Sequence, residues 1–268
     1  MNRLFLNRFV LALSTLSAIT GLLFLGWILA TLFVKGLNSF HFSLFFNDLI
    51  NGGLRNLIVG QLVLAALASI IGIPLGMIAG IYIREYGVGR YANLIRNLSD
   101  IMISAPSIVI GAFVYAVVVV PTGSASGFAG SIALAIMMIP IVVSTTDSML
   151  SLVPKELREA GIALGASKYK VITDIVLKAA KVGIMTGILL AFARIVGETA
   201  PLLFTSETSN YFSLDLTDSF PSLTVSIYDL ANEPEQKSRD LAWAASFILT
   251  VMVLIINLTG RFITRNKK

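Results

Sequence analysis

An arginine and a glutamate lie four residues apart near the middle of a long apolar stretch. They are Arg194 and Glu198 in ARIVGETAPLLF, residues 193–204. An ionisable side chain at the centre of a membrane span costs about 2.5–3.5 kcal/mol, so such residues usually serve a function. Arginine presents a planar, permanently charged fork of donors that suits a tetrahedral oxyanion. We expect the pair to lie on the path of an anionic solute or, alternatively, to be a buried ion pair that locks two helices together.

The positions around this pair predict where it faces. At about 100° per residue, Arg194 and Glu198 fall on one narrow side of a helix together with small residues. These small residues are Gly183, Gly187 and Ala191. The pair is therefore expected to face protein or a cavity rather than lipid, and its spacing allows the two side chains to contact each other. Gly197 and Pro201 predict that the helix is bent or loosened at the same place.

Residues that support other chemistry are scarce. The chain has no cysteine and a single histidine, His41, so no metal site, disulfide or Ser-His-Asp triad is predicted. An intramembrane hydrolase using Glu198 as general acid or base would need a second group beside it, and none is found. No G-x-x-x-x-G-K-[ST] phosphate-binding loop is present either, because GASKYK lacks the spacing. We expect no catalytic residue, metal or cofactor on this chain.

The composition indicates an integral membrane protein. Of the 268 residues, 56% are hydrophobic and 13% are charged, a hydrophobic excess too large for a soluble domain. The basic residues are scattered, so no nucleic-acid partner is expected. A crossing needs about 20 apolar residues, and continuous runs of this length indicate helices rather than barrel strands. The sequence predicts an all-α membrane protein with six spans, at 9–34, 57–83, 101–121, 127–149, 182–204 and 242–263.

The basic residues predict the orientation of these spans. Cytoplasmic loops carry the excess of Lys and Arg. With both termini in the cytoplasm, only Lys35, Arg55, Lys237 and Arg239 lie outside, and Arg194 lies within the membrane. The other 15 are then cytoplasmic: Arg3, Arg8, Arg84, Arg90, Arg96, Lys155, Arg158, Lys168, Lys170, Lys178, Lys181, Arg261, Arg265, Lys267 and Lys268.

The segment between the fourth and fifth spans, residues 151–180, is predicted to form a helix, a glycine turn and a second helix at the inner membrane face. Its stretch EAGIALGASKYKVITDIVL resembles the EAA loop of ABC importer permeases, E-A-A-x-x-x-G followed by spaced apolar residues. Glu159, Ala160, Gly161 and Gly165 stand at the motif positions. In that family the loop docks on the ATP-binding subunit and couples it to the helices. Gly161 replaces the second alanine, which predicts a slightly looser first helix, and Lys178 replaces a later proline.

The opening stretch narrows the resemblance. ARIVGETAPLLF closely resembles the fifth-span signature of permeases of the phosphate-specific (Pst) ABC importer, especially the A-type subunit, and APSIVIGAFVY resembles the third span of that subunit. The resemblance implies an ABC importer type-1 (MetI-like) transmembrane domain in a prokaryotic plasma (inner) membrane. Residues 57–263 would form this domain, and residues 1–56 an N-terminal transmembrane helix with its external connection. Arg194 and Glu198 are implied to serve phosphate translocation.

The same resemblance implies partners. They are a second, C-type permease, two copies of an ATP-binding subunit that would hold ATP and magnesium, and an external phosphate-binding protein. The outer segment 205–240 holds seven acidic and two basic residues, which favours delivery of phosphate by such a protein over attraction of the free anion. Two alternatives stay open. One is a permease of the same fold for sulfate, molybdate or a phosphonate. The other is an ATP-independent carrier or channel, in which the EAA-like loop would have no purpose.

Overall fold

The computed structural model of the protein describes residues 3–87 and 89–265, so Lys267 and Lys268 of the basic C-terminus lie outside the described residues. Within these residues the chain is helical and contains no strand. The α-helices are α1 (Arg3–Asn38), α2 (Arg55–Ile81), α3 (Arg90–Ser104), α4 (Ser107–Val114), α5 (Val120–Thr122), α6 (Gly127–Ser151), α7 (Lys155–Ala163), α8 (Lys168–Lys170), α9 (Leu177–Val196), α10 (Leu202–Thr205), α11 (Leu223–Asn232) and α12 (Gln236–Arg265). Short 3₁₀ turns are η1 (Phe42–Phe45) and η2 (Leu49–Asn51), and π-helical turns are η3 (Tyr82–Tyr86), η4 (Tyr115–Val119) and η5 (Val171–Val176).

Five helices among the described residues are long and apolar enough to cross a membrane. Four of them, Leu6–Asn38, Arg55–Tyr86, Gly127–Ser151 and Gln236–Gly260, contain or nearly contain the predicted first, second, fourth and sixth spans. The fifth is Lys168–Val196, so the predicted limits of 182 and 204 are wrong. This helix begins earlier because η5 and α9 continue directly from the loop, and it ends earlier at Gly197.

The third predicted span is not one helix. The segments Arg90–Ser104 and Ser107–Thr122 meet at an angle of 105° and together satisfy the length and hydropathy of a span. The break falls at Ala105, whose ψ of 134° is extended. The ring of a proline disfavours helical backbone angles in the residue before it, so Pro106 forces Ala105 out of the helix. α3 therefore ends before Ala105, and α4 begins after Pro106. The prediction of a continuous helix over 101–121 is therefore wrong, whereas six crossings remain if this bent pair counts as one.

Glycine contacts define how the central helices run. Three glycines of α2 face α6: Gly72 faces Met138, Gly76 faces Val142 and Gly80 faces Thr146. The order is the same along both helices, so α2 and α6 are parallel. A Cβ added at Gly76 would lie only 2.7 Å from the Val142 Cβ. Small residues at every fourth position thus allow the close approach that the pattern predicts. Because α2 and α6 are parallel, the bent α3–α4 segment between them must return across the bundle.

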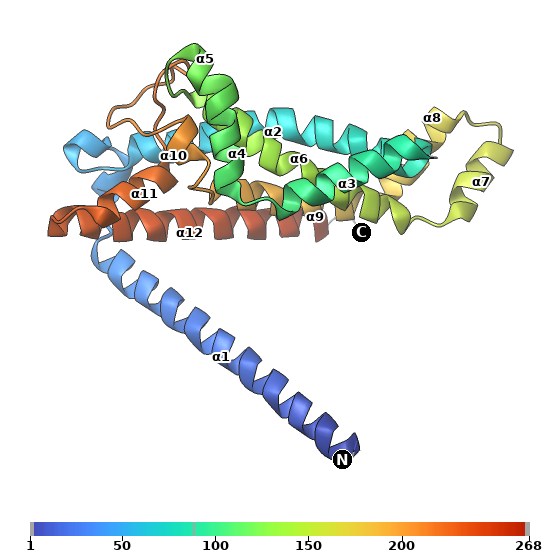
Figure 1. The fold of residues 1–268 in the computed structure, drawn as a ribbon, viewed down its shortest axis with the longest axis horizontal. Helices are drawn as coiled ribbons and strands as arrows, with labels where there is room; N and C mark the ends of the chain where they lie inside the picture. The colour runs from blue at the N-terminus through green and yellow to red at the C-terminus, as the bar shows by residue number, and fades with distance from the viewer. Residues whose placement is uncertain (1–2, 88, 266–268) are drawn as a thin grey trace.

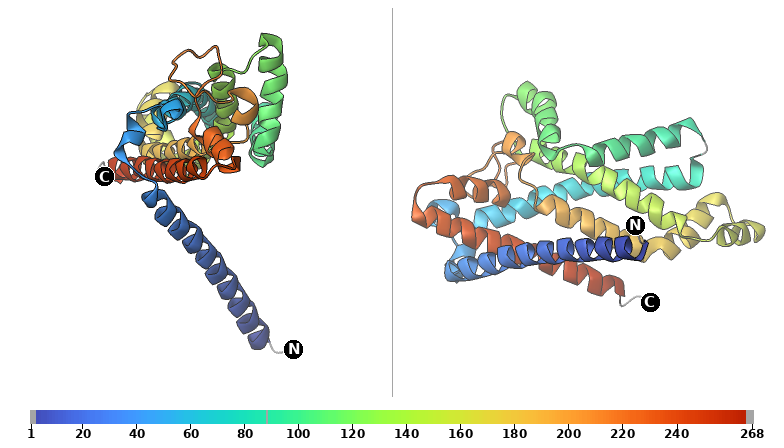
Figure 2. Two further views of the ribbon diagram at one scale, coloured as in Figure 1. Left: turned by 90° about the vertical axis from the view of Figure 1, so that its left-hand side faces the viewer. Right: turned by 60° about the horizontal axis from the view of Figure 1, so that its bottom comes forward.

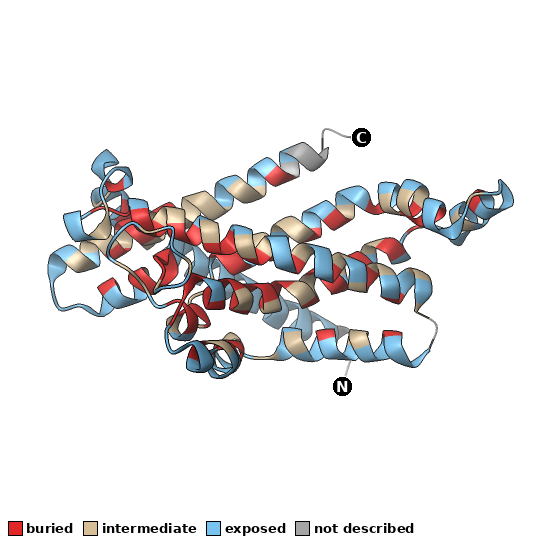
Figure 3. Ribbon diagram, turned by 90° about the horizontal axis from the view of Figure 1, so that it is seen from above, coloured by how far each residue is buried: buried red, intermediate tan, exposed pale blue. Residues whose placement is uncertain are grey.

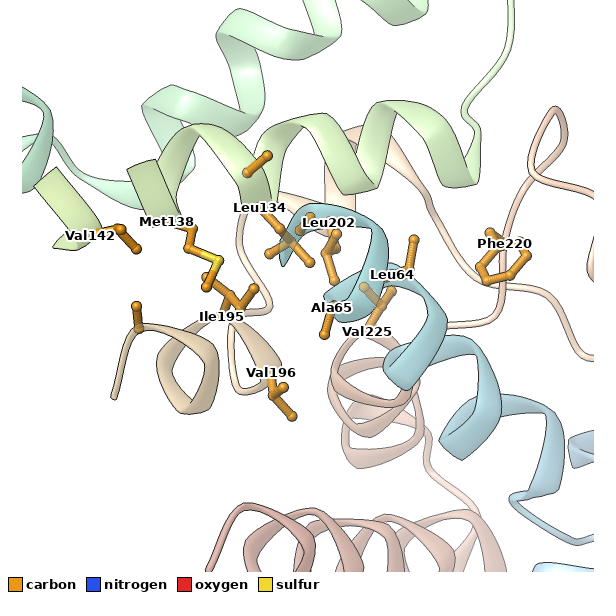
Figure 4. Packing of buried hydrophobic residues seen from close by; sticks show 13 residues of the cluster. Leu64, Ala65, Leu134, Met138, Val142, Ile195, Val196, Leu202, Phe220 and Val225 are labelled. Atoms are coloured by element: carbon orange, nitrogen blue, oxygen red, sulfur yellow. The ribbon is translucent and has the colours of Figure 1, made fainter. Parts of the chain in front are cut away.

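The core lies where α2, α6 and α9 meet the segments that follow α9. Figure 4 shows Leu64 and Ala65 of α2, Leu134 and Met138 of α6, and Ile195 of α9 gathered around one region. Further members come from after the end of α9, namely Leu202, Phe220 and Val225. Figure 3 shows the buried residues concentrated on the inward faces of these helices, whereas the α7 end is mostly exposed.

The first helix stands apart from the rest. Its last turns pack on α12, where Phe33 contacts Phe247 edge-to-face at 5.3 Å and Lys35 lies over the Trp243 ring. From there α1 projects away from the other helices, as Figures 1 and 2 show. None of the residues in the most apolar stretch of α1 is buried within this chain. The N-terminal helix thus contributes little to the core that positions the candidate site.

Candidate functional site

The charged pair of the fifth span lies at the end of a helix. α9 ends at Val196, Gly197 caps it, and Glu198 and Thr199 are not helical. The predicted loosening at this place is confirmed. The placement of both charges near the middle of a continuous helix is wrong, because only Arg194 belongs to α9.

Arg194 and Glu198 nevertheless contact each other. The Arg194 Nε atom lies 3.5 Å from the Glu198 Oε1 atom, and the two side chains are 51% and 19% exposed. Among the described residues, the guanidinium makes no hydrogen bond. An arginine carries five N–H donors in a fixed fork, so nearly the full donor set of Arg194 is left without an acceptor among the described residues. The pair occurs within the chain, which the sequence left open.

The small residues that share the Arg194 side of α9 pack on α6. Gly183 faces Met149 and Gly187 faces Thr145, so α9 runs antiparallel to α6. Ala191 is fully buried. This side of α9 therefore faces protein, as predicted, up to the last turn, where the Arg194 side chain emerges half-exposed.

A buried glutamine holds the end of α9. Gln61 of α2 has 0% exposure, and its Nε2 donates to the Val196 carbonyl at 2.9 Å. Its Oε1 accepts from the Ser222 hydroxyl and the Leu223 N–H, both at 3.1 Å. The last carbonyls of a helix lack partners within the helix, so this carboxamide satisfies one of them. The sequence reading missed Gln61, although a carboxamide in the apolar run VGQLVL was a visible signal.

A second neutral contact fixes the residue after the helix. The Thr224 hydroxyl, near the start of α11, donates to the Glu198 carbonyl at 2.9 Å. Thr224 is 2% exposed and also contacts Ser222, the N-cap of α11. The backbone on both sides of Gly197 is thus attached to α2 and α11, which places the Arg194–Glu198 pair on a well-determined break.

The predicted helix–glycine turn–helix of the loop is confirmed. α7 ends in a Schellman motif, in which the Gly165 N–H donates to the Ile162 carbonyl and the Ala166 N–H donates to the Gly161 carbonyl. Gly165 has φ of +82°, a conformation that glycine adopts without strain. This glycine therefore has a defined role in turning the chain.

The other motif positions divide between a buried and an exposed side of α7. Gly161 is buried, and a Cβ added there would lie 2.8 Å from Ile175 Cδ1 and 2.9 Å from Val171 Cγ2 of η5. Glycine in place of the second alanine thus lets α7 approach η5 closely. Glu159 and Ala160 are exposed and available to a partner.

A group of ion pairs at the α7 end was also missed. Arg158, next to Glu159, contacts both carboxylate oxygens of Glu85 in η3, the shortest distance being 2.6 Å. Asp147 of α6 pairs with Arg84 at 2.8 Å and Arg96 at 3.0 Å. An acid at the end of the apolar run 127–149 signals such a cluster, but its partners lie 51 residues or more away in sequence.

The remaining part of the described chain offers no alternative metal centre. Across residues 3–87 and 89–265, no three His, Asp or Glu side chains gather in a way that would hold a metal ion. The His41 ring Nδ1 atom lies 3.0 Å from the Ser39 carbonyl oxygen.

Comparisons with known proteins bear on these features. The family model described as "Binding-protein-dependent transport system inner membrane component" matches residues 72–266. The phosphate transport system permease protein PstA of Yersinia pestis is 46% identical over 268 residues, covering 98% of this chain and 91% of the relative. PstA of Haemophilus influenzae is 45% identical, with 98% and 95% coverage. PstA 1 of Mycobacterium tuberculosis is 39% identical over 214 residues, with 79% and 70% coverage.

Solved structures share the fold. The MetNI methionine ABC transporter in an inward-facing conformation superposes with a TM-score of 0.64 at 18% identity, covering 81% of this chain and 95% of that one. An amino acid ABC transporter gives a TM-score of 0.61 at 18% identity, with 80% and 92% coverage. The predicted MetI-like type-1 fold is confirmed.

Proposed function

The chain belongs to the family of inner-membrane components of binding-protein-dependent transport systems and is a permease subunit of a phosphate ABC importer, and we propose that Arg194 and Glu198 form part of its phosphate path. The permease would form half of that path and a second, C-type permease the other half. The relatives named as phosphate permeases favour this solute over sulfate, molybdate or a phosphonate.

One observation carries the proposed site. The Arg194 side chain is half-exposed, makes no hydrogen bond among the described residues, and has only a 3.5 Å contact with Glu198. A phosphate oxyanion would take up these donors as charge-assisted hydrogen bonds, which are stronger than the loose ion pair. Glu198 would partly neutralise the empty site and then give way to the arriving anion. The exposed side of Arg194 would face the second permease.

Coupling to ATP would pass through the loop 151–180. α7 exposes Glu159 and Ala160 beside apolar side chains that this chain leaves uncovered. These are Leu157, Ile162 and Leu164, of which Leu164 is 89% exposed. An exposed apolar patch of this kind is typical of a protein interface. We assign it to one of two ATP-binding subunits, which would hold ATP and magnesium and carry out hydrolysis.

The opposite end would receive the phosphate-binding protein. A cavity of about 880 Å³ opens there between the end of α1, η2 and the start of α12, lined by Glu233, Glu235, Lys237 and Asp240 among others. In the neighbouring segment, hydrogen bonds from Thr217 lower the pKa of Asp215, so this carboxylate stays charged. An acidic rim repels free phosphate and suits delivery by a docked protein.

The inferred orientation puts α7 and both termini in the cytoplasm. The start of α1, the end of α12 and α7 all lie to the right of the 205–222 segment in Figure 1. In this orientation, 15 of the 20 Lys and Arg residues are cytoplasmic, as the rule for cytoplasmic loops requires. The chain would thus be a multi-pass protein of a prokaryotic plasma (inner) membrane.

The test is phosphate uptake by Arg194→Ala in proteoliposomes that contain both permeases, the ATPase and the binding protein. We expect ATP-dependent uptake to fall at least about 100-fold, because the variant lacks the charge-assisted hydrogen bonds that the guanidinium would donate to phosphate. The complex should still assemble, since Arg194 is half-exposed. Excess sulfate should not suppress uptake by the wild-type complex.

Arg55→Ala is the matched control. Arg55 pairs with Asp48, and these side chains are 46% and 18% exposed, almost as in the Arg194 pair, but they lie at the outer start of α2. This variant should transport normally. Normal uptake by assembled Arg194→Ala would contradict the proposed site, and disassembly of Arg194→Ala alone would indicate an ion pair that holds helices together. Uptake of sulfate would overturn the solute.

A further inference from the structure

One helix is attached by buried polar contacts to both the coupling loop and the charged pair. α2 continues without interruption into η3, so Arg55–Tyr86 is a single helical element. Glu85 lies near its inner end and Gln61 near its outer end. The two residues are 24 positions apart, which corresponds to about 36 Å at 1.5 Å per residue.

The inner attachment joins α7 to α2. Glu85 is 6% exposed and Arg158 is 19% exposed as side chains. All three guanidinium nitrogens of Arg158 donate: to both Glu85 oxygens, to the Leu150 carbonyl at 2.9 Å and to the Val153 carbonyl at 2.7 Å. A fully occupied, largely buried fork of this kind resists rotation, so α7 cannot move without moving Glu85 or breaking the contact.

The outer attachment joins α2 to the break after α9. Gln61 donates to the Val196 carbonyl, which lies two residues from Arg194 and from Glu198. The Gln61 Oε1 atom accepts hydrogen bonds from Ser222 and Leu223 at the start of α11. A shift of α2 along or about its axis would therefore change the position of the last turn of α9, and with it the Arg194 guanidinium.

We propose that α2 carries the movement of the coupling helix α7 to the Arg194–Glu198 site, with Arg158–Glu85 and Gln61 as its two attachments. This inference rests on the proposed role of the loop 151–180 in coupling. Glu85, Arg158 and Gln61 are then positioning residues that do not touch phosphate. Their loss would separate ATP hydrolysis from transport without abolishing either the ATPase or the fold.

The packing around α2 supports its movement as one body with α6. Gly76 and Gly80 contact Val142 and Thr146 so closely that the helices have little room to slide. Asp147 adds ion pairs to Arg84 on η3 and Arg96 on α3. α7 also packs on η5, so the coupling helix contacts two π-helical turns, which occur often at functional sites.

The test compares Glu85→Gln, Gln61→Leu and the double variant in the complete reconstituted transporter. The measured quantity is phosphate taken up per ATP hydrolysed, together with basal ATPase activity and co-purification of all subunits. Each single variant should lower the ratio by about tenfold, in the range expected for positions that carry coupling. The double variant should be no worse than the more affected single variant, because both act on one transmission step. Distant, independent residues would instead give effects that multiply.

Asn56→Leu is the control for loss of a buried amide on the same helix. Asn56 is 1% exposed, accepts from the Leu49 N–H and donates to the Ser209 carbonyl, so these hydrogen bonds go to residues outside α9. It should leave the ratio unchanged. An unchanged ratio in assembled Glu85→Gln, or a double variant whose loss is the product of the singles, would overturn the proposal.

Two further outcomes keep this inference separable from the proposed function. If Glu85→Gln does not assemble, Glu85→Asp preserves the charge and tests the contact length, and failure of both to assemble would show a purely structural pair and overturn the proposal. If the wild-type complex moves another oxyanion, the ratio is measured with that solute. The proposed substrate then fails while the coupling test still stands.

Discussion

Arg194 and Arg158 each pair with a glutamate, but the two pairs are built differently. Arg194 lies 3.5 Å from Glu198, is 51% exposed and makes no hydrogen bond among the described residues. Arg158 contacts both oxygens of Glu85 at 2.6–3.2 Å, is 19% exposed and also donates to backbone carbonyls. The first arginine has donors left for a ligand, whereas the second has its nitrogens engaged by the chain itself.

This difference separates a pair that can exchange its partner from one that fixes structure. Exposed ion pairs contribute about 0–1 kcal/mol, so Glu198 holds Arg194 weakly enough for an anion to replace it. Breaking a buried pair costs about 3–5 kcal/mol, since it leaves a charge without compensation. We propose that the same two residue types serve anion binding in the Arg194–Glu198 pair and attachment of α7 to α2 in the Arg158–Glu85 pair.

The largest expected effect is on protein stability, when the Arg158–Glu85 pair is broken. Glu85→Ala leaves the Arg158 guanidinium buried without its carboxylate, and should reduce the free energy of unfolding by about 3 kcal/mol. Glu198→Ala should reduce it by less than about 1 kcal/mol, because its partner is half-exposed to solvent. The apparent melting temperatures of the two purified complexes in detergent measure the difference.

Asp48→Ala supplies the reference for an exposed pair. Its partner Arg55 is 46% exposed, so the melting temperature of this variant should be close to that of Glu198→Ala and higher than that of Glu85→Ala. Equal melting temperatures for Glu85→Ala and Glu198→Ala would remove the distinction between the two pairs.

A smaller effect is expected from Thr224→Val, which keeps the side-chain shape but removes the hydroxyl bound to the Glu198 carbonyl. A buried carbonyl left without its partner costs about 1–3 kcal/mol. The break after α9 would be held less well, so the KM for phosphate uptake should rise severalfold while assembly persists.

Thr208→Val is the matched control for this change. Its hydroxyl contacts Ser226 at 2.8 Å on the same helix α11 but does not reach the pair. An equal rise in KM in both variants would mean that Thr224 acts through α11 packing rather than through Glu198.

Much of the fold follows from the sequence because hydrophobic length is a local property. The apolar runs locate four spans within a few residues, and Gly197 with Pro201 indicates the break beside the charged pair. The bend at Ala105–Pro106 is hidden because apolar composition continues across it, so a hydropathy reading joins α3 and α4.

The attachments of the site are less accessible to sequence reasoning because they are long-range. Gln61 reaches Val196 over 135 positions, and Arg158 reaches Glu85 over 73. A polar residue in an apolar run, such as Gln61 or Asp147, signals that a partner exists. The identity of that partner depends on which helices become neighbours in the folded bundle, and this is set by tertiary packing over long sequence separations.

The smallest expected effect is at the departure from the EAA motif, Gly161→Ala. Alanine favours a helix over glycine by about 1 kcal/mol. The added Cβ would approach the terminal methyls of Ile175 and Val171 within 2.9 Å, and moving them offsets that gain. The free energy of unfolding should therefore stay within about 1 kcal/mol of wild type, as the melting temperature of the complex would show. Gly165→Ala, where φ is +82° and no neighbour crowds the new Cβ, should instead destabilise the turn by about 1–2 kcal/mol. If Gly161→Ala proves the more damaging of the two, the contact of α7 with η5 is tighter and less adaptable than its side-chain partners indicate, and α7 would transmit movement through η5 as well as through Glu85.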